Sequence, residues 1–382
     1  MRKQLASAQF GAGARRIGAV GLCLALWTFV PGLSAKALDR KATIITIDAP
    51  GAGTSAGQGT GTFAINPAGV ITGFLSDADG VRHGLVRAPN GTITTFDVPG
   101  AGTESFQGTR AYSINPAGAV TGWYSDASNV AHGYVRAPGG SITTFDVPDA
   151  GGAGTGSLPG TFGYNINPAG VIAGYYTDVN FVFHSFVRAP DGTITTFDAP
   201  GASTSSGQGT FTAQLNGINP TGAVTGNYTD ASGVNHGYVR APGGAITVFN
   251  VPGTGNAGPG GINPAGTIVG SYMDASGVNH GFVRAADGTF TIFDVPGAGT
   301  APGQGTSGEN INTPGDVDGI YIDASSVNHF FVRSKHGAIT TFDAPGTSGG
   351  PGTIVGTNNP VGAVTGRYAD ANGVFHGFLR TP

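Results

Sequence analysis

Seven histidines recur along this chain at intervals of 44 to 52 residues, and an aspartate stands six positions before each of them. A carboxylate beside an imidazole can bind a polar ligand or pass a proton in acid–base catalysis. The pair can equally serve the architecture, with the aspartate capping its own turn and the histidine bonding a neighbouring backbone group or carboxylate. Seven near-identical copies favour architecture, because a fold needs every copy whereas an active site needs one. The candidate ligand-binding face comprises Asp77, His83, Asp126, His132, Asp178, His184, Asp230, His236, Asp274, His280, Asp323, His329, Asp370 and His376.

An arginine follows each of these histidines by four positions, and a second recurring phrase of the type Thr-Thr-Phe-Asp ends in aspartate in six copies and in asparagine in the other. Because the two segments are expected to be adjacent strands, we expect Arg–Asp pairs between them. Binding of a sugar carboxylate or a phosphate by the arginines is the alternative. The arginines are Arg87, Arg136, Arg188, Arg240, Arg284, Arg333 and Arg380, and the matching residues are Asp48, Asp97, Asp146, Asp198, Asn250, Asp294 and Asp343.

Familiar catalytic and metal-binding motifs are missing from the sequence. Asp77-Ala-Asp79-Gly80 is a single Asp-x-Asp-Gly, and it lacks the other carboxylates of a calcium loop. The glycine-rich stretches lack the Gly-Lys-Ser/Thr of a phosphate loop, and Gly-x-Ser-x-Gly is absent. Glu104 and Glu309 are the two glutamates, in different copies. We therefore assign no catalytic residue, no metal and no cofactor. The sixth copy diverges most, adding Asp316 and Asp318 among others, and a function private to one copy is expected there if anywhere.

The elements that carry these residues are short strands between tight turns. Asn115-Pro116-Ala117-Gly118 has the residue order of a type I turn, and Asp126-Ala-Ser-Asn129 marks a second turn. Between the turns lie β-favouring runs, which predict four strands per repeat of about 49 residues. In one repeat these strands are expected at Ala111–Ile114, Ala119–Ser125, Ala131–Arg136 and Ser141–Val147.

The order of the phrases predicts how the chain closes. Apolar residues occur on both faces of the strands, so each small sheet is expected to be covered on both sides. The chain begins with an unmatched fourth strand, Thr43–Asp48, and ends just after a third strand. We therefore predict an all-β fold, a seven-bladed β-propeller with four-stranded blades whose ring is closed by the N-terminal strand. A stacked β-solenoid is the alternative.

These repeats resemble a known class. His-Gly-Phe/Tyr-Val-Arg, together with Gly-Ile-Asn-Pro-x-Gly and Thr-x-Phe-Asp-x-Pro, is similar to the bacterial extracellular repeats named HAF after a His-Ala-Phe tripeptide. The resemblance covers nearly all of residues 43–382, although most copies carry Gly in place of the Ala. It implies export and a repetitive β fold, and it supplies no activity and no catalytic residue.

Composition and the N-terminal segment indicate where the protein works. A basic start, an uncharged apolar run over residues 17–30 and Ala35-Lys36-Ala37 predict a signal peptide over residues 1–37, followed by one propeller domain over residues 38–382. Cleavage leaves 13 basic against 22 acidic residues, which argues against nucleic acid as a partner. We predict a secreted or periplasmic protein, not integral to the membrane, that binds a glycan or an extracellular protein without catalysis. An extracellular lyase or hydrolase using His and Asp in the central funnel, and a self-assembling surface protein, are the alternatives.

Overall fold

The computed structural model describes residues 42–154, 158–347 and 353–382, which belong to the compact unit Lys41–Pro382. The predicted signal peptide lies outside the described residues. Every regular element of the described chain is a β-strand, as the turn spacing predicts. None of the described residues forms a helix long and apolar enough to cross a bilayer.

The strands are β1 (Thr43–Ile47), β2 (Gly59–Ile65), β3 (Ile71–Ser76), β4 (Arg82–Arg87), β5 (Ile93–Phe96), β6 (Gly108–Ile114), β7 (Val120–Ser125), β8 (Ala131–Arg136), β9 (Ile142–Phe145), β10 (Thr161–Ile166), β11 (Ile172–Thr177), β12 (Phe183–Arg188), β13 (Ile194–Phe197), β14 (Thr210–Thr212), β15 (Val224–Thr229), β16 (Asn235–Arg240), β17 (Ile246–Phe249), β18 (Gly258–Ile262), β19 (Ile268–Met273), β20 (Asn279–Arg284), β21 (Phe290–Phe293), β22 (Gly305–Ile311), β23 (Val317–Ile322), β24 (Asn328–Arg333), β25 (Ile339–Phe342), β26 (Ile354–Asn358), β27 (Val364–Ala369) and β28 (Phe375–Thr381).

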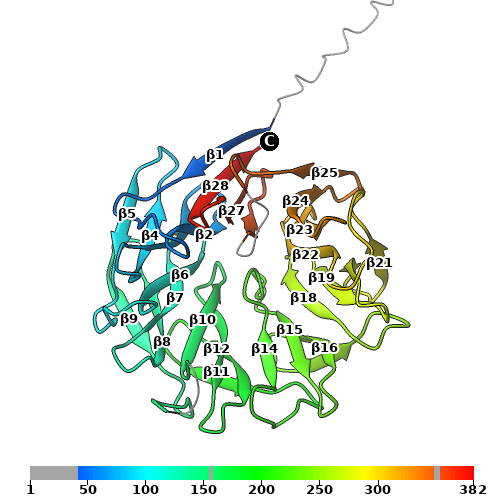
Figure 1. The fold of residues 1–382 in the computed structure, drawn as a ribbon. Helices are drawn as coiled ribbons and strands as arrows, with labels where there is room; N and C mark the ends of the chain where they lie inside the picture. The colour runs from blue at the N-terminus through cyan, green and yellow to red at the C-terminus, as the bar shows by residue number, and fades with distance from the viewer. Residues whose placement is uncertain (1–41, 155–157, 348–352) are drawn as a thin grey trace, which may run out of the picture. The chain divides into compact units, whose positions relative to one another are not determined.

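The strands form successive four-stranded antiparallel meanders, which are the blades of a β-propeller (Figure 1). The blades are β2–β5, β6–β9, β10–β13, β14–β17, β18–β21 and β22–β25, and β1 joins β26–β28. In Figure 1 the first strands β6, β10, β14, β18 and β22 face the middle, and the fourth strands β5, β9, β21 and β25 lie at the rim. The predicted four-strand repeat is therefore confirmed. The solenoid alternative does not fit, because the strands pair within each repeat rather than stacking repeat on repeat.

At several junctions a single parallel backbone pair links neighbouring blades. Arg82 on β4 pairs in parallel with Gly108 at the start of β6, and Gly59 pairs with Phe375 in the same way. Gly108 has a φ of 102° there, and an added Cβ would lie 2.1 Å from the carbonyl oxygen of Arg82. Glycine is thus required at this blade junction, both for its backbone angle and for its lack of a side chain.

The core is distributed over the spaces between blades. All six residues of β3, β7 and β11 are buried, although neighbouring side chains point to opposite faces of the sheet. One buried cluster joins Phe145 and Val147 of one blade to Ile172, Tyr176 and Phe186 of the next. These three sheets are therefore covered on both faces, as the sequence predicts.

The N-terminal strand pairs with the C-terminal one. All five residues of β1 pair antiparallel with β28, from Thr43 opposite Thr381 to Ile47 opposite Gly377. Ile47 is buried against Ile65, Ile71 and Ala363. β1 thus lies beside β28, at the position that the fourth strand holds in the other blades.

Candidate functional site

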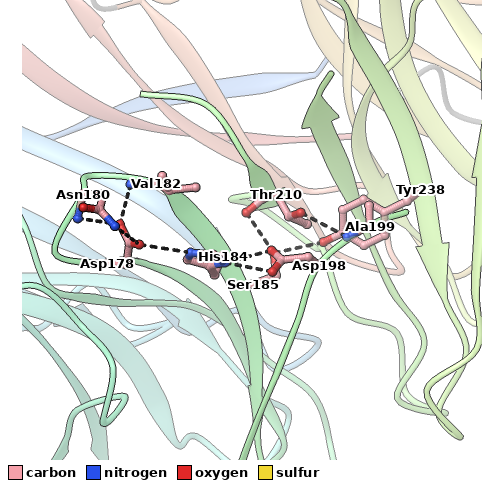
Figure 2. Close-up of polar contacts among 9 residues, drawn as sticks. All are labelled: Asp178, Asn180, Val182, His184, Ser185, Asp198, Ala199, Thr210 and Tyr238. Atoms are coloured by element: carbon pink, nitrogen blue, oxygen red, sulfur yellow. Dashed lines mark hydrogen bonds and ion pairs between the residues drawn. The ribbon is translucent and has the colours of Figure 1, made fainter. Parts of the chain in front are cut away.

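Each predicted Asp–His pair belongs to a three-residue set built within one blade (Figure 2). In the blade β10–β13, Nδ1 of His184 lies 2.9 Å from Oδ2 of Asp198, which follows the fourth strand. Its Nε2 faces Oδ2 of Asp178 at 3.8 Å, and Oδ1 of Asp178 accepts the amide of Val182 at 2.8 Å. The turn, the third strand and the fourth strand are thereby tied together.

The same arrangement recurs in the other blades. The Nδ1 contacts to the rim aspartates measure 2.7 to 2.9 Å, and the Nε2 contacts to the turn aspartates measure 3.0 to 3.8 Å. In the blade β14–β17, Asn250 takes the place of the rim aspartate, and its Oδ1 lies 2.8 Å from Nδ1 of His236. In the last blade the rim residue is Asp48, which follows β1.

The paired carboxylates shift the protonation of several histidines. The hydrogen bond that Asp146 accepts raises the pKa of His132, and the bond that Asp198 accepts does the same for His184. Burial of His83 opposes its charged form, but its bonds to Asp97 and Asp77 outweigh burial and raise its pKa. The paired carboxylates thus stabilise the protonated form of these imidazoles.

The structure therefore places all fourteen residues of the predicted ligand-binding face, and it gives each of them a partner within its own blade. None of them lines any of the three cavities described below. The role of these residues in ligand binding stays a prediction.

The expectation of Arg–Asp pairs between the third and fourth strands is wrong. Arg136 pairs with Ile142 in the β8–β9 ladder, which leaves Asp146 opposite His132 instead. The guanidinium of Arg136 lies over the ring of Phe96 in the preceding blade, 4.9 Å from its centroid. The arginines of five later repeats stack in the same way, so their repeated role is to join adjacent blades.

The Asn-Pro turns form a hydrogen-bonded series. Nδ2 of Asn66 donates to the carbonyl oxygen of Asn115 at 3.2 Å, and Oδ1 of Asn66 accepts the amide of Val70 at 3.0 Å. The donor contact repeats from each blade to the next at 3.2 to 3.5 Å, through Asn115, Asn167, Asn219, Asn263, Asn312 and Asn359. The last of these donates back to the carbonyl of Asn66. A small cavity of about 150 Å³ opens between these turns.

Two larger cavities lie against the inner strands. One of about 570 Å³ is lined by Tyr175, Phe211, Asn227 and Glu309, among others. The other, of about 340 Å³, is lined by Arg82, Arg110, Tyr112 and Arg367, among others. Gln214, Leu215 and Ile354 line both, so the two cavities adjoin.

The residues that line these cavities occupy the positions at which the repeats differ. One such position holds Phe74, Trp123, Tyr175, Asn227, Ser271, Ile320 and Arg367, although a glycine precedes every one of them. A second such position lies two residues before the Ile-Asn of the turn. In the five repeats that keep this Ile-Asn and have no insertion before it, the position holds Phe63, Tyr112, Tyr164, Gly260 and Glu309. At this second position the inner strand carries a β-bulge, because the pairing register skips the residue. A bulge re-aims a side chain, and here it leaves the varying residue outside the ladder.

The fourth repeat adds a short insertion at the same place. Three additional residues separate Gly209 from Ile218, compared with Gly59 and Ile65 in the first repeat. Gln214 and Leu215 of this segment line both cavities, and Asn216 has a φ of 52°. The insertion thus shapes the boundary between the two cavities.

The divergent sixth repeat contributes two acidic groups to the interior. Glu309 lines the larger cavity, and burial raises its pKa to about 7. Asp318 is fully buried, its pKa is raised well above the usual range by burial, and neither carboxyl oxygen has a hydrogen-bond partner among the described residues. Sequence reasoning noted both residues but did not connect them to a cavity. Repeat-to-repeat variation was the signal that would have done so.

Within residues 42–154, 158–347 and 353–382, no group of three or more His, Cys, Asp or Glu side chains is arranged to hold a metal ion. The aspartate pair at Asp77 and Asp79 illustrates why, because Oδ1 of Asp77 accepts the amides of Asp79 and Val81 in its own turn.

Comparison with known proteins gives similarity to solved structures only. No protein-family model matches the chain, and no curated protein matches its sequence. TolB from Acinetobacter baumannii aligns over 87% of this chain with a TM-score of 0.43 and 11% identity, and the alignment spans 66% of that chain. The BP39L lectin from Burkholderia pseudomallei aligns over 84% of this chain and 95% of the lectin, with a TM-score of 0.46 and 13% identity. The lectin of Aleuria aurantia, described as a six-bladed β-propeller with fucose recognition, aligns over 81% of this chain and 96% of the lectin, with a TM-score of 0.43 and 12% identity. At these values the likeness assigns no function to this chain.

Proposed function

We propose that this chain is an exported, closed seven-bladed β-propeller of the HAF repeat type that binds a carbohydrate in its central cavity without catalysis. Two observations support closure of the ring. β1 pairs along its whole length with β28, and the hydrogen bonds of the Asn-Pro turns return to Asn66. A closed ring of seven blades accounts for both observations.

One observation carries the binding function: the positions that vary among otherwise near-identical repeats line the two adjoining cavities. A scaffold residue is needed in every repeat, as the Asp–His sets and the stacked arginines show. A recognition residue is needed in one place, so it is free to differ from its counterparts. The residues that line the two cavities differ from repeat to repeat, so the needs of the repeated scaffold do not account for them.

The chemistry of the larger cavity suits a sugar. Tyr175 and Phe211 present aromatic rings, whose centroids are 5.7 Å apart, and aromatic faces pack against the apolar faces of pyranose rings. Asn227, Asn235 and Gln214 add amides that both donate and accept hydrogen bonds, as a set of sugar hydroxyls requires. A volume of about 570 Å³ lies within the range of small-molecule sites.

A glycan array followed by titration calorimetry tests this function. We expect the purified chain to bind a glycan saturably. Asn227→Ala should weaken binding by about tenfold or more, because the Asn227 amide is expected to form about two hydrogen bonds with the ligand. Asn180→Ala, in an exposed turn outside the cavities, is the matched control and should bind as the parent does. Absence of any glycan binding, or an equal loss in the control, would contradict the proposal.

Glu309 supports a second candidate, a glycan lyase or hydrolase. A carboxyl group whose pKa is raised to about 7 can act as a general acid or base at neutral pH, and it lines the larger cavity. Release of new sugar ends from a bound glycan, abolished by Glu309→Gln with binding retained, would establish the enzyme. Binding with no release by the parent chain would leave the non-catalytic function.

A further inference from the structure

Three arginines gather at the smaller cavity, and they come from different blades. Arg82 lies on β4, Arg110 on β6 and Arg367 on β27, and all three line a space of about 340 Å³ with Phe63, Phe74 and Tyr112. None of them belongs to the repeated arginines that join adjacent blades. Each stands at a position that holds other residue types in the other repeats.

Aromatic rings and one carbonyl hold the guanidinium groups in place. Arg110 lies over Trp123, 3.9 Å from a ring centroid, and Arg367 lies over Phe375 at 4.6 Å. Nη1 of Arg82 and Nη2 of Arg110 both donate to the carbonyl oxygen of Phe106, at 3.0 and 2.9 Å. Stacked guanidinium groups are weakly hydrated and keep their N–H edge for a partner in the ring plane.

Two of the three arginines lack an acidic partner in the part of the chain that the structure describes. Among the described residues neither Arg82 nor Arg110 has an acidic group within ion-pair distance, because the ion pairs there join histidine to aspartate. Arg110 is 7% exposed, and no described residue forms a hydrogen bond with its Nη1. Burial lowers the pKa of Arg82, and the nearby charge of Arg367 lowers it further. Like charges in a partly buried cavity cost free energy unless an anion offsets them.

We propose that this cavity is an anion subsite, so that the glycan bound by the propeller carries an oxyanion, such as the carboxylate of a uronic acid. This inference rests on the proposed carbohydrate-binding function. A planar carboxylate matches the paired N–H groups of a guanidinium, and several arginines around one site are typical of oxyanion recognition. Because the two cavities adjoin, the charged group lies by the arginines while neutral parts of the sugar extend toward Asn227 and Tyr175.

Calorimetry with three matched oligosaccharides tests the subsite on the purified chain. Oligogalacturonate carries free carboxylates, its methyl ester is neutral, and a sulfated oligosaccharide carries a different oxyanion. We expect the acid to bind at least tenfold more tightly than its methyl ester, and its affinity to fall as NaCl rises from about 50 to 500 mM. Preferential binding of the sulfated sugar would support the same oxyanion subsite with sulfate as its source.

Charge-removing variants identify the residues. Arg82→Gln and Arg367→Gln should each weaken binding of the acid by about tenfold or more and leave the weak binding of the methyl ester unchanged. Arg82→Lys retains charge and should keep part of the affinity. Arg136→Gln, which removes a repeated arginine outside the cavities, is the matched control. If a variant melts early, the salt dependence and the ester comparison on the parent chain still decide the question.

The outcomes separate the two proposals. Equal affinity for acid and ester, unaffected by Arg82→Gln, would overturn the anion subsite and leave carbohydrate binding intact. If no glycan binds, the probe becomes inorganic phosphate against NaCl at equal ionic strength. A rise in melting temperature with phosphate, absent in Arg82→Gln, would retain the anion subsite and overturn the carbohydrate function. No response to phosphate would overturn both.

Discussion

Asp318→Thr is expected to stabilise the protein, although it changes a fully buried residue. Four other repeats have threonine at this position, at Thr72, Thr121, Thr225 and Thr365. Each of these hydroxyls donates to a backbone carbonyl on the next strand, at 2.7 to 3.0 Å. Neither oxygen of the Asp318 carboxyl has such a partner among the described residues. The substitution removes an unsatisfied buried group, which is worth about 1 to 3 kcal/mol, and it adds a hydrogen bond, which is worth about 0.5 to 1.5 kcal/mol.

The gain should depend on pH with a defined sign. Burial raises the pKa of Asp318 in the folded state, so the native protein retains a proton that the unfolded chain loses above about pH 4. The unfolded state then binds fewer protons, and the free energy of unfolding falls as pH rises, by about 1.4 kcal/mol for each pH unit between the unfolded and the folded pKa. Asp318→Thr abolishes this contribution. Its advantage over the parent should therefore be larger at pH 6 than at pH 5.

Urea denaturation of parent and variant at both pH values measures the difference, in which the other titrating groups cancel. Thr121→Asp supplies the reciprocal test, since it places the same carboxyl at the equivalent position of another blade and should destabilise. A variant at position 318 that is less stable than the parent, or a difference that does not change with pH, would refute the reasoning.

Three further predictions concern the scaffold. Ile47→Ala should lower the free energy of unfolding by about 2 to 5 kcal/mol, because Ile47 is buried on β1. Ile45 lies on the same strand and is 40% exposed, so Ile45→Ala should lower it by less than about 1 kcal/mol. Equal losses in urea denaturation would show that β1 does not complete the last blade. Asn115→Ala should lower stability by about 1 to 3 kcal/mol, since it breaks bonds to Asn167 and Ala119 at once, and an unchanged melting temperature would contradict the role of the turn series. His132→Gln should lower the free energy of unfolding by about 1 kcal/mol at pH 5.5 and by less at pH 8.5. The raised pKa of His132 contributes stability that is fully present below about pH 6.5 and is lost as pH rises through the pKa of the folded state. A larger loss at pH 8.5 would argue against the charged pair.

The repeat sequence predicts the strands because turn chemistry acts locally. The run Ala131–Arg136 is predicted and found with the same bounds, and the Asn-Pro-Ala-Gly turn closes with the amide of Gly118 donating to Asn115 at 2.9 Å. The Arg–Asp error was a matter of register. Counting outward from the turn at Ala137–Ser141 puts Arg136 opposite Ile142 and His132 beside Asp146, so this contact was readable from the sequence.

The cavities were harder to foresee. Identical residues in every copy drew attention to the Asp–His sets, while the residues that line the cavities are those that differ. Comparing repeats position by position would have singled out Arg82, Tyr175 and Glu309. No sequence pattern, however, reveals that a bulge releases Glu309 from the ladder or that Gln214 and Leu215 divide the interior, because both depend on how the inner strands pack around a common centre.

The pairing of β1 with β28 also fixes an order of events during synthesis. β1 appears first, yet its partner lies more than 300 residues later, which at a usual rate of chain growth means a wait of roughly 20 to 60 s. During that interval a β-branched segment, Thr43–Ile47, carries an unpaired edge, which is a template for pairing with another chain. Two copies that meet in this state can exchange β1 and complete each other's last blade, because the register is the same whether the strand comes from the same molecule or from another. β1 is therefore synthesised before the other described strands and is the last of them to find its pairing partner.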